Sequence, residues 1–184
     1  MGYVIHSSET APAESKATME RFVKAWGFLP NLGAVIAESP AAIELLWAAY
    51  AALTSKGTLS PAEQQVVSIA VSRQNRCGYC VSAHSTLAAG SNVPANALEA
   101  LRDGKRVGDP KMEALRAVAT RLARNRGVLS QSEKAEFLGA GFAPGQLLEV
   151  VGWVAVKTLT NYVNHLAETP VDPQWQGQLW VPND

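Results

Sequence analysis

Both cysteines of this chain lie in one short segment, and one of its three histidines follows closely. The segment reads Cys77-Gly78-Tyr79-Cys80, and His84 comes four residues after the second cysteine. Each residue of an α-helix turns by about 100°, so Cys77, Cys80 and His84 would share one face of a helix. His84 would lie one turn from Cys80, where an imidazole can take the thiol proton, and the two cysteines can capture each other as a disulfide. The spacing predicts thiol redox chemistry at these three residues.

Cys77 falls at the expected start of this helix. There, unpaired backbone N–H groups and the positive end of the helix dipole favour a thiolate. A free thiol has a pKa of about 8.5 and is only a few per cent ionised at neutral pH. Lowering that pKa by about two units takes about 2.7 kcal/mol, which a helix start and a nearby cation can supply. We therefore expect a low thiol pKa in this segment.

The helix expected just before the cysteines carries a polar stripe on otherwise apolar sequence. Gln65, Ser68 and Ser72 recur at helical spacing, which fits a small polar cavity facing the cysteines. Gln65 can line that cavity or be an ordinary buried amide. Tyr79, between the cysteines, suits a pocket wall or packing better than catalysis.

Composition excludes several classes of function. The 184 residues carry 16 Lys and Arg against 16 Asp and Glu, and 47% are apolar. With zero net charge and no basic run, we expect no nucleic-acid partner. No apolar stretch reaches the roughly 18 to 20 residues of a membrane span, and the first 17 residues lack the pattern of a signal peptide. We therefore expect no membrane partner and a cytoplasmic location, where a CxxC pair is more often redox-active or metal-binding than a permanent disulfide.

The apolar pattern is helical almost throughout. Ser60 with Glu63, and Ser130 with Glu133, have the spacing of capping boxes that start helices. Expected helices span residues 14–26, 40–54, 61–75, 77–89, 94–102, 110–122 and 144–166, with another after Ser130. No strand alternation stands out, and no helical period fits after Thr169. We predict an all-α helical bundle in one domain, residues 1–184, with an extended N-terminal arm (1–13) and an extended C-terminal arm (169–184).

Three motifs together carry a family resemblance. Leu59-Ser60-Pro61, the CxxC segment with His84, and Asn161-Tyr162-Val163-Asn164-His165-Leu166-Ala167 resemble the AhpD-like alkylhydroperoxidase group of the carboxymuconolactone decarboxylase superfamily. The resemblance covers about residues 15–172 and is closest to the branch of uncharacterised peroxidase-related proteins. It implies an AhpD-like fold that assembles as a homo-oligomer, a trimer or hexamer.

The resemblance also implies an activity. Cys80 would attack a small hydroperoxide with His84 as the base in a proton relay, and Cys77 would resolve the product as a disulfide. No metal or organic cofactor is expected, and an external dithiol protein would act as reductant in antioxidant defence.

The chain departs from that family at one relay position. Where the family relay uses a glutamate, this chain has Gln65, whose amide can orient His84 or a water but cannot exchange a proton at neutral pH. Some members place a histidine between the cysteines, where Tyr79 is a weaker proton carrier. The sequence therefore favours thiol–disulfide exchange more firmly than rapid peroxide turnover.

Other interpretations of the same residues stay open. The superfamily also contains decarboxylating lyases, whose reaction needs no redox pair. The thiols can instead be structural or serve a non-enzymatic redox sensor. Cys77, Cys80 and His84 can also bind zinc if His165 or His6 supplies a fourth ligand.

Three residues late in the chain suit structural roles. His165, four residues after Asn161, can belong to the relay or the pocket, although a structural or interface role suits both residues better. Trp175 and Trp180 lie in the irregular C-terminal arm, where we expect them to cover a surface such as that of a neighbouring subunit.

Overall fold

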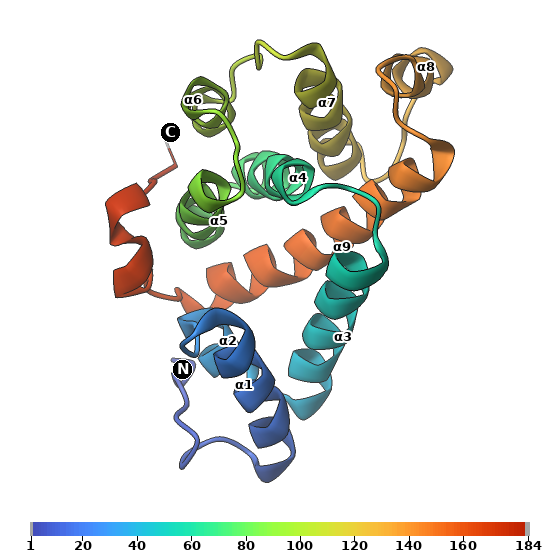
Figure 1. The fold of residues 1–184 in the computed structure, drawn as a ribbon. Coiled ribbons are helices and arrows are strands. Elements are labelled where there is room, and N and C mark those ends of the chain that lie inside the picture. The colour runs from blue at the N-terminus through green and yellow to red at the C-terminus, as the bar shows by residue number, and fades with distance from the viewer. Residues whose placement is uncertain (1, 183–184) are drawn as a thin grey trace.

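The computed structural model describes residues 2–182, and all regular structure in that range is helical (Figure 1). The α-helices are α1 (Ala13–Trp26), α2 (Asn31–Ile36), α3 (Pro40–Lys56), α4 (Pro61–Gln74), α5 (Gly78–Gly90), α6 (Ala95–Asp103), α7 (Pro110–Arg124), α8 (Gln131–Gly139) and α9 (Pro144–Ala167). A short 3-10 helix, η1 (Pro173–Gln178), follows. The all-α class predicted from the sequence is confirmed.

Helix α4 lies at the centre of the molecule, with α5, α7 and α9 packed against it (Figure 1). Every residue from 64 to 72 is buried. The helix starts at the predicted capping box: Ser60 Oγ accepts from the Glu63 N–H at 3.3 Å, and the Glu63 carboxylate accepts from the Ser60 N–H at 2.8 Å. Pro61 follows at the first helical position, where its missing N–H costs nothing. These signals fix where α4 begins, and hence which of its residues face α5.

Helix α9 crosses the whole molecule and joins its two apolar cores (Figure 1). Its 24 residues reach about 36 Å, at about 1.5 Å per residue. One core, around Leu115 and Trp153, lies between α4, α6, α7 and α9. The other, around Ile43 and Val156, lies between α1, α2, α3 and α9. Polar residues on α9 therefore reach the interior only where they face α4 and α5.

Two short helices, α2 and η1, were not predicted. Each has six residues, two turns or fewer, which is too short for an apolar period to be recognised. The prediction of an extended C-terminal arm is therefore wrong over residues 173–178. That segment coils because Trp175 is buried against Trp26 and Phe28 at ring-centroid distances of 6.0 and 5.6 Å.

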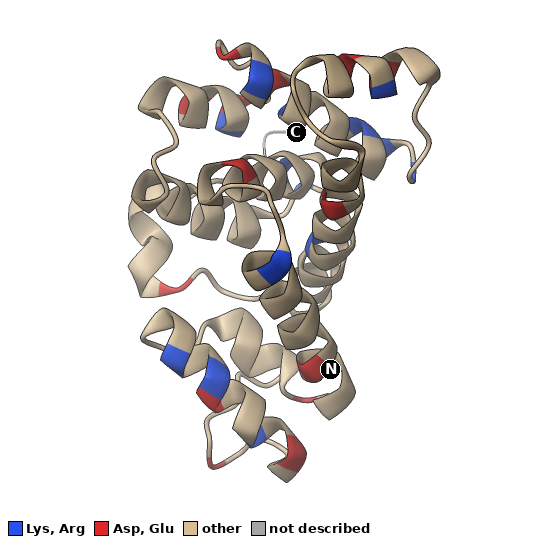
Figure 2. Cartoon of the chain, turned by 45° about the vertical axis from the view of Figure 1, so that its right-hand side comes forward, with Lys and Arg blue, Asp and Glu red and all other residues tan. Residues whose placement is uncertain are grey.

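Charged residues of both signs are interspersed over the outer helices (Figure 2). Among residues 2–182, Lys157 and Asp172 are the only Lys, Arg, Asp or Glu side chains that are buried. In the same range, no single helix has the length and hydropathy of a membrane span, and the one helix pair that does, α8 with α9, is bent by 110°.

The capping box of α4 gives a stability prediction. Replacing Ser60 with alanine leaves the Glu63 N–H without its side-chain acceptor, and we expect the free energy of unfolding to fall by about 1 kcal/mol in urea denaturation. Ser55→Ala is the matched control, because Ser55 is exposed and only donates to a carbonyl of its own helix. Equal effects of the two substitutions would contradict this interpretation.

Candidate active site

The two cysteines lie at the start of α5, directly after a tight turn from α4. Cys77 is the residue that precedes the helix, and Cys80 lies in its first turn. The turn is closed by a hydrogen bond from the Cys77 N–H to the Ser72 carbonyl at 2.9 Å, and Arg76 adopts the left-handed conformation with φ 59°. Both thiols are free, and each cysteine is only 1% exposed. The predicted position of Cys77 at the helix start is confirmed, whereas its near-complete burial was not foreseen.

A polar stripe on α9 faces the thiols. Lys157, Thr160, Asn161 and Asn164 follow one another at helical spacing and are all buried. The Asn164 amide donates to Cys80 Sγ at 3.3 Å and lies 3.9 Å from Cys77 Sγ. Cys80 Sγ also lies 3.7 Å from Thr160 Oγ1. Apart from Asn161, sequence reasoning missed this stripe.

Lys157, His84 and Gln65 form a chain of short hydrogen bonds. Lys157 Nζ lies 2.6 Å from His84 Nε2, and His84 Nδ1 lies 2.8 Å from Gln65 Oε1. A lysine ammonium can only donate, so Nε2 accepts and the ring proton is on Nδ1, where the Gln65 oxygen accepts it. Gln65 and His84 are therefore brought together as the polar-stripe hypothesis requires.

His84 does not contact Cys80 in the way its spacing predicted. Within residues 2–182 no hydrogen bond joins the imidazole to the Cys80 thiol, because both ring nitrogens are occupied by Gln65 and Lys157. Burial, followed by the charge of Lys157, holds the pKa of His84 well below its usual value. The imidazole is therefore neutral at physiological pH and reaches the thiol only through its neighbours.

The two thiols have opposite acidities. Burial opposes ionisation of Cys80, but the hydrogen bond from Cys77, the charge of Lys157 and further hydrogen bonds together hold its pKa well below the usual value. The hydrogen bond to Cys80, together with burial, raises the pKa of Cys77. The ionised sulfur is thus Cys80, although the helix start seemed to favour Cys77.

The remaining predicted residues divide into two groups. Ser72 belongs to the site, since its Oγ accepts from the Asn161 amide at 3.2 Å. Ser68 is buried on the same face of α4, and its hydroxyl has no hydrogen-bond partner within the described chain. Tyr79 is a pocket wall: its hydroxyl donates to Asp172 at 2.6 Å. His165 is exposed and lies outside this cluster.

A small cavity of about 40 Å³ lies beside Cys80. Its polar lining includes Cys80, His84, Lys157 and Thr160, and most of its wall is apolar or aromatic, supplied by Phe22, Trp26, Leu32, Leu46, Tyr50, Tyr79, Val156 and Trp175. A cavity of this size has room for a few atoms beside the sulfur. The site therefore presents one ionised sulfur and one cation to a small, largely apolar molecule.

Residues 171–182, here called the strap, cover the cysteines from outside. Its first half is anchored by Asp172, which accepts from the Tyr79 hydroxyl and, at 3.0 Å, from the Asn31 N–H. Trp175 then packs edge-on against Tyr79 at a centroid distance of 5.4 Å, in one apolar cluster with Cys77 and Cys80. The expectation that Trp175 covers a neighbouring subunit is wrong, because it fills a pocket of its own chain.

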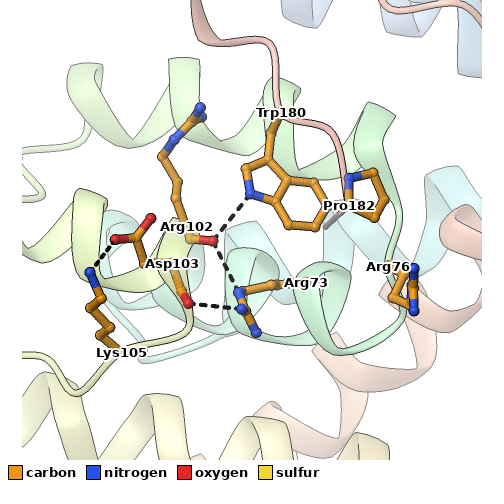
Figure 3. Close-up of a pocket in the computed structure, with 7 residues that line it drawn as sticks. All are labelled: Arg73, Arg76, Arg102, Asp103, Lys105, Trp180 and Pro182. Carbon is orange, nitrogen blue, oxygen red and sulfur yellow. Dashed lines mark hydrogen bonds and ion pairs between the residues drawn. The ribbon is translucent and has the colours of Figure 1, made fainter. Parts of the chain in front are cut away.

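The second half of the strap lies over the start of α5 and is held by Arg102 (Figure 3). The Arg102 guanidinium donates to the carbonyls of Gln178 at 2.9 Å and Leu179 at 3.0 Å. The Trp180 N–H donates to Ser82 Oγ at 2.9 Å. A Cβ atom at position 78 would lie 3.0 Å from the Trp180 carbonyl, so the glycine between the cysteines permits this close approach. Trp180, too, is packed against its own chain.

A larger surface pocket of about 380 Å³ beside the strap is rich in cations, including Arg73, Arg102 and Lys105 (Figure 3). Arg73 donates to the carbonyls of Arg102 at 3.0 Å and Asp103 at 2.8 Å, and Lys105 pairs with the Asp103 carboxylate. These side chains thus tie α4, α6 and the strap together, and none of them reaches the thiols.

The zinc interpretation requires about four ligands. Within residues 2–182 no group of three or more His, Cys, Asp or Glu side chains is arranged to hold a metal ion. His165 faces solvent, and His6 bonds Glu38 at 2.7 Å. The described residues therefore give this interpretation no support.

Comparison with known proteins identifies the fold. An alkylhydroperoxidase AhpD core, an uncharacterized peroxidase-related protein from Ralstonia eutropha JMP134, superposes with a TM-score of 0.85 at 18% identity, covering 98% of this chain and 97% of that one. An uncharacterized peroxidase-related protein from Silicibacter sp. TM1040 superposes with a TM-score of 0.79 at 18% identity, covering 97% of this chain and 94% of that one. The debrominase Bmp8 was solved as a cysteine-to-alanine variant in complex with 2,3,4-tribromopyrrole. It superposes with a TM-score of 0.79 at 14% identity, covering 97% of this chain and 95% of that one. At these identities the likeness concerns the fold.

The sequence matches a family model over part of its length. Residues 40–121 match the carboxymuconolactone decarboxylase family, a range that contains α4, α5 and the CxxC segment. No curated protein matches the chain significantly. The chain thus has the AhpD-like helical fold and, over residues 40–121, the sequence pattern of the carboxymuconolactone decarboxylase family, in agreement with the resemblance.

The strap gives a testable prediction about access to the thiols. Arg102→Ala removes two hydrogen bonds to strap carbonyls. A hydrogen bond with a charged donor contributes about 1.5 to 3 kcal/mol. We expect the strap to open more often and the reaction of the thiols with a disulfide reagent to become at least about tenfold faster. Arg106→Ala removes the same charge from an exposed side chain four residues later and serves as control. An unchanged rate in Arg102→Ala would contradict the role of the strap.

The neutral state of His84 predicts a pH dependence of stability. In the unfolded chain a histidine has a pKa of about 6.5, whereas that of His84 in the native protein is well below the usual value. As pH falls below about 6.5, the unfolded state binds a proton that the native state does not, so stability is lost. Between about pH 7.5 and about pH 5.5 the loss due to His84 is about 1.4 kcal/mol.

Urea denaturation at both pH values measures this loss. The loss should be smaller by about 1.4 kcal/mol in His84→Gln and unchanged in the control His165→Gln, whose ring is exposed. The ionised Cys80 contributes a loss of the same sign, which both variants keep. The same pH dependence in His84→Gln as in the unmodified protein would show that another group is responsible.

Proposed function

We propose that this protein is a thiol-dependent oxidoreductase that reduces small hydroperoxides, with Cys80 as the attacking and Cys77 as the resolving cysteine. The observation that carries the proposal is the asymmetry of the pair: the sulfur that lines the cavity, Cys80, is the one that its surroundings ionise. Cys77 stays protonated beside it and is available as the resolving thiol. The match of residues 40–121 to the carboxymuconolactone decarboxylase family and the fold shared with peroxidase-related proteins support the same reaction class.

The first half-reaction oxidises Cys80. The thiolate attacks the terminal oxygen of the hydroperoxide, a sulfur–oxygen bond forms, the oxygen–oxygen bond breaks, and the alkoxide leaves and takes up a proton to become the alcohol. Cys80 becomes a sulfenic acid. The Asn164 amide, which donates to Cys80 Sγ at 3.3 Å, orients the sulfur for this attack.

The second half-reaction closes the disulfide. Cys77 sulfur attacks the Cys80 sulfenic acid, and its proton leaves with the hydroxyl group as water. An external dithiol protein then reduces the disulfide by thiol–disulfide exchange. Because both sulfurs are buried beneath the strap, this reductant reaches them only after the strap moves.

Other parts of the proposal rest on the resemblance or on exposed surface. The expected homo-oligomer stays a prediction. The exposed apolar side chains of Leu148, Tyr162 and Leu166 on the outer face of α9 are available for contact with another subunit. A redox sensor would use the same first oxidation but would not turn over with a dithiol donor, so steady-state turnover separates it from an enzyme.

Substitution of each cysteine tests the assigned roles. Cys80→Ser should abolish hydroperoxide consumption, because no other thiol lines the cavity. Cys77→Ser should still consume about one equivalent of hydroperoxide and accumulate a sulfenic acid, since nothing resolves it. Peroxide assays with mass spectrometry distinguish these products, and circular dichroism checks the fold. Undiminished turnover in Cys80→Ser would refute the proposal.

A further inference from the structure

Lys157 is a buried cation that the proposed reaction has not yet used. It is 4% exposed, lies in the middle of α9 and lines the same cavity as Cys80. We propose that Lys157 is the catalytic acid of the peroxide reaction: its ammonium protonates the departing alkoxide, and the Gln65–His84 chain positions it. This inference rests on the proposed function and names a further catalytic residue for it.

The cavity makes such an acid necessary. Breaking the oxygen–oxygen bond releases an alkoxide, a strong base, among mostly apolar and aromatic side chains. An unpaired anion in such surroundings pays a large desolvation cost. A proton delivered as the bond breaks avoids that cost, and acid catalysis of this kind is commonly worth about 10²- to 10⁴-fold in rate.

The other proton donors at the cavity are already committed. The Tyr79 hydroxyl donates to Asp172, and the Thr160 hydroxyl donates to the Lys157 carbonyl at 3.1 Å. His84 Nδ1–H donates to Gln65, while its Nε2 accepts. An ammonium has three donors, and within the described chain that of Lys157 makes one hydrogen bond, to His84. Its remaining protons can be given to a substrate oxygen.

The glutamine at position 65 suits this arrangement. Because its amide oxygen only accepts, it keeps the proton on His84 Nδ1 and leaves the Nε2 lone pair for Lys157. A carboxylate there would favour an imidazolium, which donates from both nitrogens and would no longer accept from the ammonium. Gln65 and Lys157 therefore fit one another. Where the family that the sequence resembles has an acidic relay residue, this site has a glutamine, and it also has a buried lysine.

The proton balance closes over a full cycle. The ammonium gives one proton to the alkoxide and becomes a neutral amine. Closure of the disulfide releases water and consumes no further proton. When the dithiol reductant regenerates two thiols, Cys80 gives its proton to the amine, which restores the thiolate and the ammonium. Lys157 thus acts as base toward Cys80 and as acid toward the alkoxide.

Two oxidants with different leaving groups test this role. tert-Butyl hydroperoxide releases an alkoxide that needs a proton, whereas peracetic acid releases a carboxylate that does not. The rate of Cys80 oxidation is measured for each in the unmodified protein, in Lys157→Met and in the control Lys24→Met, whose side chain is exposed. All rates are measured at neutral pH and divided by the fraction of Cys80 that ultraviolet absorbance shows as thiolate in each variant.

We expect Lys157→Met to lose about 10²- to 10⁴-fold with tert-butyl hydroperoxide and much less with peracetic acid, while Lys24→Met loses nothing. Equal losses with both oxidants would mean that Lys157 acts only on the thiol, and no loss would mean that it does not act; either result overturns the inference. Failure of the unmodified protein to be oxidised by either reagent would instead overturn the proposed function, and this inference with it.

Discussion

The structure depends on one constraint, the burial of the Lys157 ammonium between α9, α4 and α5. An isolated charge in the interior costs several kcal/mol, so its neighbours must compensate it. They do so in two ways: His84 stays neutral and accepts its hydrogen bond, and Cys80 ionises as its counter-charge. The buried lysine thus contributes, after the hydrogen bond from Cys77, to the acidity of the reactive thiol.

The same constraint explains why the two cysteines differ. Asn164 contacts both sulfurs, but Cys80 is the one that lines the cavity with Lys157. Once Cys80 is ionised, its negative charge and its hydrogen bond with Cys77 keep that second thiol protonated. The strap then excludes water from the pair, which strengthens every charge interaction beneath it and also makes strap movement a condition of reduction. Acidity and access are therefore set by separate parts of the chain.

The sequence predicts what local signals determine. The capping box at Ser60 and the CxxC spacing place α4 and α5 correctly, and the polar stripe of Gln65 and Ser72 does face the site. Lys157 was missed because its hydrogen-bond partner, His84, lies 73 residues away in sequence. A signal was present: Lys157 is the only Lys or Arg in α9, and it shares a face with Asn161 and Asn164. The strap could not be predicted, since irregular chain carries no period and its contacts with Arg102 and Tyr79 are long-range.

The central claim is that Cys80, and not Cys77, is the ionised thiol, because it accepts a hydrogen bond from Cys77 and lines one cavity with Lys157. Titration of thiolate absorbance in Cys77→Ser, in Cys80→Ser and in Lys157→Met measures this directly. The account predicts a thiolate that titrates well below about pH 8.5 in Cys77→Ser, none in that range in Cys80→Ser, and a raised thiol pKa in Lys157→Met. Titration near about pH 8.5 in both single-cysteine variants, or a thiol pKa indifferent to Lys157, would contradict it.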